Sequence, residues 1–152
     1  MPRSMSVSRL TRSLRLPSLA LALGAAIFVT GCGEQGGPRV PVFPVSGEVQ
    51  IEGEKPAGAV VVFHATNAGA PTARGTVGPD GKFKLSTYET GDGAAPGEYK
   101  VTVSLFKVVQ KEGSAVPGPN VLPDKFSKPD ATPLKVTVAA GPNDLAPLVV
   151  KK

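Results

Sequence analysis

Period-two alternation of apolar and polar residues is the feature that most constrains how this chain can fold. Segment 45–52 places valine, glycine and isoleucine at odd positions, with serine, glutamate and glutamine at even positions. Segment 99–105 alternates in the same way, with tyrosine, valine and leucine against lysine, threonine and serine. Because successive side chains of a strand point to opposite faces, both segments are expected to be half-buried strands. No segment has helical periodicity, so the fold is expected to be built from strands.

Turn sequences separate further strands in the middle of the chain. Residues 59–63 form a continuous apolar run rich in β-branched side chains, which indicates a strand covered more fully. Residues 74–77 and 82–85 flank Gly78-Pro79-Asp80-Gly81. Since glycine, proline and aspartate favour tight turns, the two flanking segments are expected to pair as a hairpin.

The C-terminal part adds two strands and one long connection. Alternation at 134–138 predicts a strand, and a last strand is expected in 145–150, at a sheet edge or after Pro147, because proline cannot donate to a ladder. The stretch 107–133 contains five prolines and is expected to be irregular, of a length that is often functional or disordered. Six or seven short strands predict an all-β fold, a small antiparallel β-sandwich, because a sheet with one wet face must bury the other.

The only cysteine, Cys32, ends an apolar run that follows a basic N-terminus. Four arginines and no acidic residue precede the 14 residues of 16–29, a length typical of a signal peptide and shorter than the about 20 residues of a membrane helix. Val29-Thr30-Gly31-Cys32 resembles a bacterial lipobox. That resemblance implies cleavage between Gly31 and Cys32 and lipid attachment to the Cys32 thiol. An ordinary secretory signal beside an unmodified thiol is the alternative.

This interpretation divides the chain into a signal peptide (1–31), a lipid-anchored tether rich in glycine and proline (32–44) and one domain (45–152). Twelve residues, 33–44, span at most about 40 Å. Apolar residues at the end of the tether leave a second interpretation open, in which this part packs along the domain as an edge segment. They are Val40, Val42 and Phe43.

Charge and cysteine content exclude some classes of partner and bond. Without its signal peptide the chain has 13 Lys and Arg against 12 Asp and Glu, scattered along its length. Nucleic-acid binding is not expected, since it needs basic residues gathered on one face. With one cysteine, no intramolecular disulfide can form, so stability must come from a packed core.

Several turn-and-strand segments occur in an order and spacing known from one domain family. They are 45–49, 56–63, 80–83 and 96–103, followed by 122–126, 132–138 and 141–143. The first four resemble the carboxypeptidase regulatory-like, or transthyretin-like, domain, and the later three resemble its version on small bacterial envelope lipoproteins. The resemblance implies a seven-stranded β-sandwich of prealbumin type with an accessory, adhesive or scaffolding role and no catalytic residues.

No catalytic or metal-binding constellation is found in the sequence. A histidine-assisted nucleophile needs a base beside it, and His64 is the only histidine. Strand alternation is expected to point His64 outward when Phe63 faces the core. Zinc needs three or four ligands, which one histidine and no free thiol do not supply. We therefore expect no catalytic residues, no metal and no cofactor.

The glycine-rich segment 90–97 carries acidic residues nearby, at Glu89, Asp92 and Glu98. Their spacing matches no calcium-binding loop. A solvated turn, with Asp92 shaping its backbone, is the interpretation that we favour.

Two aromatic residues in predicted loops, Tyr88 and Phe126, are candidate contacts for a glycan or a peptide. The competing role for both is packing, in which each ring fastens its loop to the sandwich. The chain has no tryptophan, which disfavours stacking on sugars.

The function expected from the sequence is non-catalytic. It is that of an exported module, lipid-anchored to the cell membrane or outer membrane through Cys32, with a structural or protein-interaction role. Binding is expected through a strand edge or the long connection 107–133, to an envelope protein or a glycan that the sequence does not identify. A carbohydrate-binding or surface-adhesion module is the alternative.

Overall fold

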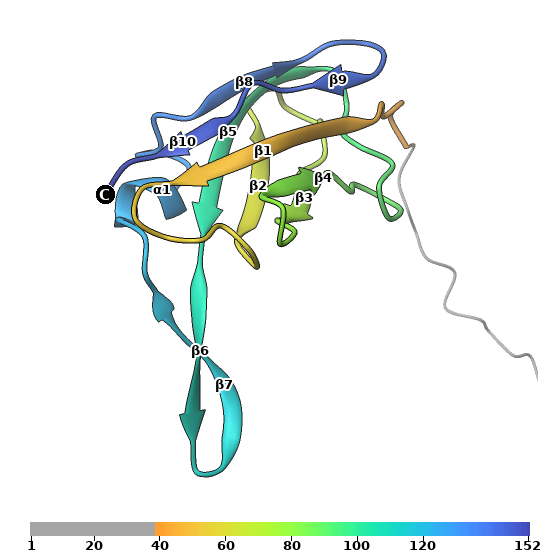
Figure 1. Ribbon diagram of the computed structural model, residues 1–152. Helices are drawn as coiled ribbons and strands as arrows, with labels where there is room; N and C mark the ends of the chain where they lie inside the picture. The colour runs from red at the N-terminus through yellow and green to blue at the C-terminus, as the bar shows by residue number, and fades with distance from the viewer. Residues whose placement is uncertain (1–38) are drawn as a thin grey trace, which may run out of the picture. The chain divides into compact units, whose positions relative to one another are not determined.

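The computed structural model describes residues 39–152, and Figure 1 shows the arrangement of their strands. The predicted cleavage and lipid site at Gly31 and Cys32 lies outside this range. No helix in the part that the structure describes is long and apolar enough to cross a membrane.

Two four-stranded sheets form the body of the domain. The first is centred on β1 (Val45–Ile51), which pairs antiparallel with β4 (Lys82–Lys84) and parallel with β9 (Asn143–Asp144) and β10 (Leu148–Val150). The second sheet is antiparallel throughout, in the order β3-β2-β5-β8. Its strands are β2 (Val60–Ala65), β3 (Ala73–Thr76), β5 (Gly97–Ser104) and β8 (Lys135–Val138).

The prediction of an all-β sandwich is confirmed, and two details differ from it. The structure divides residues 39–152 into ten strands where seven were expected. The two C-terminal strands of the first sheet run parallel to β1, whereas an antiparallel sandwich was expected. The last strand begins directly after Pro147, as the missing proline N–H predicts.

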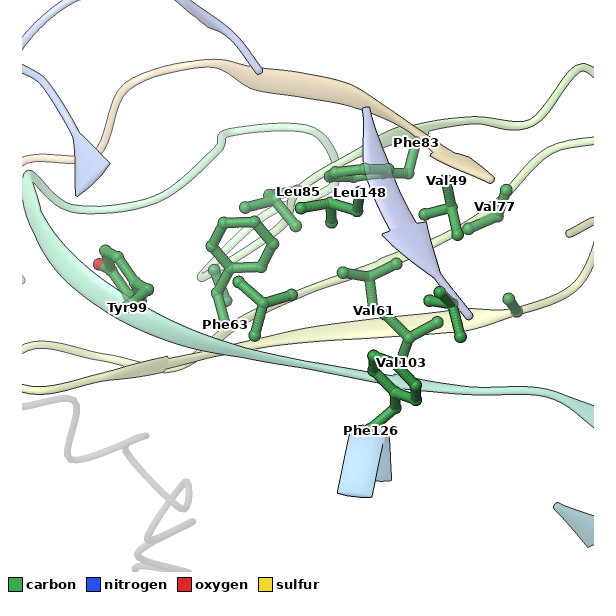
Figure 2. Close-up of a cluster of buried hydrophobic side chains, with 14 of the residues drawn as sticks. Val49, Val61, Phe63, Val77, Phe83, Leu85, Tyr99, Val103, Phe126 and Leu148 are labelled. Carbon is green, nitrogen blue, oxygen red and sulfur yellow. The ribbon is translucent and has the colours of Figure 1, made fainter. Parts of the chain in front are cut away.

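The core lies between the two sheets, and the alternation of the sequence places its residues there. β1 contributes the valines and isoleucine at its odd positions, all buried, while its even positions are more exposed. Phe63 of β2 packs between two other aromatic rings, with centroid distances of 6.2 Å to Phe83 and 5.7 Å to Tyr99. Figure 2 shows these side chains meeting in one cluster. Removal of this apolar surface from water is the main force that holds the sheets together.

The predicted hairpin of 74–77 and 82–85 forms only in part, around its predicted turn. Gly78 N–H donates to the Lys82 carbonyl at 2.7 Å across the turn. The strands on either side lie in different sheets, however, because β3 pairs with β2 and β4 pairs with β1. Besides the hydrogen bond at the turn, one isolated antiparallel bridge, between Arg74 and Ser86, joins them. Alternation predicts which face of a strand is buried, but it carries no information on which neighbour completes its hydrogen bonds.

The stretch 107–133, predicted to be irregular, contains ordered elements. β6 (Phe106–Lys111) and β7 (Ser114–Asn120) form a hairpin that extends away from the two sheets in Figure 1. Glu112 and Gly113 at its tip have φ of 52° and 81°, as in the type I′ turn of a two-residue hairpin. One short helix, α1 (Asp124–Ser127), follows. The prediction failed because two prolines interrupt β7, and prolines argue against a strand.

Residues 39–44, which we call the strap, lie against the domain. Phe43 and Ala94 exchange backbone hydrogen bonds of 2.9 Å and 3.0 Å. The second interpretation of the tether therefore holds for these residues. They belong to the folded domain, whose start was placed at residue 45.

Candidate interaction surface

Exposed apolar side chains gather on the β6–β7 hairpin, which we call the arm (residues 106–120). All six residues of β6 are exposed. Val108 has 70% of its surface exposed, Phe106 48% and Val109 42%. Only two other large apolar residues in the described chain are comparably exposed, Tyr88 and Val149. Apolar residues concentrated on one projecting element are typical of a binding surface rather than of a surface selected only for solubility.

One side chain joins the base of the arm to the sandwich through two hydrogen bonds. The Asn120 carboxamide oxygen accepts the N–H of Leu105 at 2.9 Å and the N–H of Leu122 at 3.2 Å. These two residues stand where the chain leaves and re-enters the body of the domain. The Asn120 side chain therefore links the start of β6 and the end of β7 at the point where the two strands leave the sandwich.

A charged group supports the same base. Glu54 accepts hydrogen bonds from Lys152 at 3.0 Å and from Lys107 of β6 at 3.1 Å. These two ammonium groups, Lys152 first, lower the pKa of the Glu54 carboxyl below its usual value. These contacts hold the base of the arm in position. The outer part of the arm is held only by the hydrogen bonds between β6 and β7.

Prolines make the two free edges of the arm unequal. Val108 lies opposite Pro117, and Gln110 lies opposite Ala115. Pro117 and Pro119 occupy alternate positions of β7, so their backbone nitrogens face the same side of the strand. Proline has no N–H, and it is tolerated in a sheet where that nitrogen points away from the ladder. The outer edge of β7 is therefore poor in donors.

The outer edge of β6 keeps its donors. In an antiparallel pair, directly opposed residues direct their N–H groups either both inward or both outward. Val108, opposite Pro117, and Gln110, two residues further along, therefore present N–H and carbonyl groups outward. Such an unpaired edge can accept an extended segment of another chain by strand addition.

The two aromatic residues singled out in the sequence do not form a joint platform. Phe126 is only 3% exposed, and its ring lies in the core near Val103 in Figure 2. An exposed contact at Phe126 is thus excluded by burial, and the packing role applies. Tyr88 is 37% exposed, but the guanidinium of Arg39 covers its ring at 5.2 Å from the centroid. Its hydroxyl also accepts the N–H of Val40 at 3.2 Å.

The glycine-rich loop is a turn built on Asp92, as predicted. Its carboxylate accepts backbone N–H groups of Thr87 at 2.7 Å, Tyr88 at 2.9 Å and Glu89 at 2.9 Å. Partial burial acts to raise the pKa of Asp92, but these hydrogen bonds outweigh it and the pKa lies below its ordinary value. Within residues 39–152, no three His, Cys, Asp or Glu side chains are grouped so that they could hold a metal ion.

His64 points away from the core, on the outer face of the second sheet. Its Nε2 lies 3.0 Å from the Thr102 hydroxyl, on the neighbouring strand. Burial lowers the pKa of the His64 imidazole, because it disfavours the charged form. The Thr102 side chain is itself buried, and the pair therefore offers no reactive hydroxyl to solvent.

The described fold defines the class of the protein as an all-β sandwich with a projecting hairpin. The sequence matches no family model and no curated protein. Among solved structures, it is similar to a lipoxygenase from Cyanothece PCC8801, with 14% identity and a TM-score of 0.39 over 72% of this chain and 16% of that one. It is also similar to a candidate carbohydrate-binding protein from Pseudomonas aeruginosa, with 10% identity and a TM-score of 0.40 over 76% and 91% of the two chains. The chain thus spans a small part of the lipoxygenase, and likenesses at this level carry no argument about function.

Proposed function

We propose that the protein is a non-catalytic, lipid-anchored envelope module that binds a partner protein by adding an extended segment of it to the free edge of β6. The anchor is the acylated Cys32 predicted from the sequence, at the cell membrane or the outer membrane. Two or more acyl chains suffice for stable anchoring, since each buried methylene contributes about 0.8 kcal/mol. The arm is the part of the domain that reaches the partner.

The observation that supports this function best is the exposure of β6 together with its unpaired edge. Backbone groups of Val108 and Gln110 supply hydrogen bonds that any extended segment can complete, and the exposed side chains of Phe106 and Val108 supply apolar contact. Proline on β7 limits pairing to one edge, which suits binding of a single segment rather than open-ended assembly.

A carbohydrate-binding or adhesion role is less well supported by the geometry. It would need several exposed aromatic rings on one surface, whereas Phe106 is the one aromatic residue of the arm, Phe126 is buried and the Tyr88 ring is covered by Arg39. An enzymatic role would need a nucleophile and a base open to solvent, and the His64–Thr102 pair does not provide them. The carbohydrate-binding role is an outcome of the experiment below.

The test uses a photocrosslinking amino acid at Val108 in the full chain, expressed in its native envelope. Val149, an exposed valine on β10, is the matched control position. We expect a discrete protein adduct from position 108 and none from position 149. An adduct that glycosidases remove and proteases do not would support the carbohydrate alternative and contradict this proposal.

Two proline variants test which edge is used. Gln110→Pro removes an outward N–H from β6, and Ala115→Pro removes one from β7 directly opposite. The adduct should disappear with Gln110→Pro and persist with Ala115→Pro. Equal loss in both variants, or persistence in both, would show that strand addition to β6 is wrong.

The intact mass of the same material tests the anchor: we expect a chain that begins at an acylated Cys32, and a free thiol there would contradict the anchoring.

A further inference from the structure

In the strap (residues 39–44), residues 39–43 make their hydrogen bonds and ion pair to one loop of the domain. Besides the Phe43–Ala94 bridge, Arg39 contributes its contact with the Tyr88 ring and an ion pair with Glu89 at 3.6 Å. The Val40 N–H donates to the Tyr88 hydroxyl. All these contacts are made to the loop 86–95. None of them involves a strand of either sheet.

No residue of the strap is buried in the core. Arg39, Pro41 and Pro44 are exposed, and the three residues between them are half-buried. The sandwich itself begins at the next residue, where the Val45 side chain is buried and its carbonyl accepts the Leu85 N–H at 3.0 Å. The Pro44 carbonyl is also held, by the Asn143 N–H at 2.9 Å. Detachment up to Phe43 would therefore leave every hydrogen bond of the sheets in place.

Glycine at one position of the loop is what allows the strap to dock. Gly93 has φ of 99°, and a Cβ built on it would lie 1.7 Å from the Phe43 carbonyl oxygen. Gly91 in the same loop also has positive φ, at 77°, but its Cβ would meet no atom within 4 Å. An alanine at either position would therefore have the same kind of backbone strain, but only an alanine at position 93 would collide with the strap.

From these contacts we propose that the strap is releasable, and that its detachment from loop 86–95 lengthens the tether between Cys32 and the sandwich. This inference rests on the anchoring proposed above. With the strap docked, the tether is residues 33–38, which span at most about 20 Å. With the strap released up to Phe43 it is residues 33–43, which span at most about 40 Å. Tension between the lipid and a partner bound to the arm acts on the strap first, because the chain from Cys32 enters the fold there.

Native-state hydrogen exchange of the full chain in detergent micelles tests the release. We expect the Phe43 and Ala94 amides to exchange at least about 100-fold faster than Val101 of β5, through a local opening that low denaturant does not accelerate. Gly93→Ala should remove the protection of Phe43 and Ala94 and leave that of Val101 unchanged. Gly91→Ala, the matched control, should leave all three as in the wild type.

Two results would overturn the proposal. One is exchange of Phe43 and Ala94 within a few-fold of Val101 in the wild type, which would make the strap an integral part of the sandwich. The other is an equal loss of protection at all three amides in Gly93→Ala. Should that variant fail to fold, Arg39→Ala, which removes only an exposed side chain, should accelerate exchange at Phe43 and Ala94 alone, and no acceleration would contradict the proposal.

The change in tether length has its own readout, in vesicles that hold the acylated full chain. Because lipid occupies Cys32, a Val149→Cys variant has one free thiol for a donor dye, and the bilayer carries the acceptor. Energy transfer should fall when Gly93→Ala is added and stay constant with Gly91→Ala. Constant transfer in both would overturn the lengthening. Absence of the protein from the vesicles would instead contradict the anchoring. The hydrogen-exchange data would then still test whether the strap is released.

Discussion

Single side chains complete the backbone hydrogen bonding at two irregular places of this domain. Asp92 accepts three N–H groups of the loop that receives the strap, and Asn120 accepts two at the base of the arm. Both are short side chains with oxygen acceptors, the type that favours turns over helices and ladders. Their effect is to hold non-repetitive backbone in one conformation beside the two parts of the domain to which we assign function.

Replacement of Asp92 should destabilise the domain in a pH-dependent way. Asp92→Asn is expected to lower the free energy of unfolding at pH 7 by about 1–3 kcal/mol, because charged acceptors make the stronger hydrogen bonds. The pKa of Asp92 is lowered in the folded state. Its contribution is therefore present above the ordinary aspartate value of about 3.9 and is lost as the pH falls through the folded pKa. Urea unfolding at pH 7 and at stepwise lower pH should show the difference between variant and wild type shrinking.

Asp130→Asn is the control for this measurement. Asp130 makes only an exposed ion pair with Lys100, at 3.2 Å, so its replacement should change stability by less than about 0.5 kcal/mol. A difference for Asp92→Asn that does not vary with pH, or that is no larger than the control, would show that the carboxylate is not what holds the loop.

The arm behaves as an element distinct from the sheets that it leaves. Its two strands pair only with each other, and a lone two-stranded hairpin is marginally stable in water. Two features compensate: the type I′ turn, whose twist matches that of the strands, and the fixed base at Asn120 and Glu54. An element of low intrinsic stability, anchored at one end, can adjust to a partner while the sandwich stays unchanged.

Loss of the Asn120 carboxamide should loosen the arm. Asn120→Ala leaves the Leu105 and Leu122 N–H groups without their acceptor, which should cost about 1–3 kcal/mol of unfolding free energy. Hydrogen exchange should accelerate most at these two amides and along the arm. Asn120→Asp retains an acceptor oxygen and should restore most of the protection.

Gln110→Ala, on the exposed part of β6, is the matched control and should stay within about 0.5 kcal/mol of the wild type. If Asn120→Ala were as mild as this control, the base of the arm would have to be held by other contacts.

At the scale of the whole molecule, a small core between two sheets carries the stability. The chain has no disulfide to support it, and the core depends on a few large side chains, among them Phe63, Phe83 and Tyr99. Domains of this size are stable by only about 5–15 kcal/mol. A single large cavity in the core therefore removes a considerable fraction of the total.

Phe63→Ala should be among the most damaging substitutions in the chain. Phe63 is fully buried, and truncation of such a ring costs about 3–5 kcal/mol through lost transfer energy and the remaining cavity. Thermal unfolding should show a large fall in Tm. Phe106→Ala removes the same ring from an exposed position of the arm and should change stability by less than about 1 kcal/mol. Similar effects of the two would mean that the core does not lie where the structure places it.

The sequence by itself determined the class of fold and the inward faces of the main strands. Alternation at 45–52 and 99–105 identified the buried side of β1 and β5, because side-chain direction along a strand is a local property. The loop role of Asp92 was also local, since its acceptors and donors lie within five residues of each other. For the long stretch 107–133, the sequence predicted an irregular connection and did not predict its hairpin.

Only the tertiary structure decided which strands pair, which rings are buried and where the fold begins. β4 joins β1 instead of β3, and β10 runs parallel to β1, because every residue except proline offers the same backbone groups and the choice of partner depends on segments distant in sequence. Phe126 is drawn into the core, and the strap docks on a loop about 50 residues away, for the same reason. Burial and close approach are properties of the assembled sheets, and no local pattern encodes them.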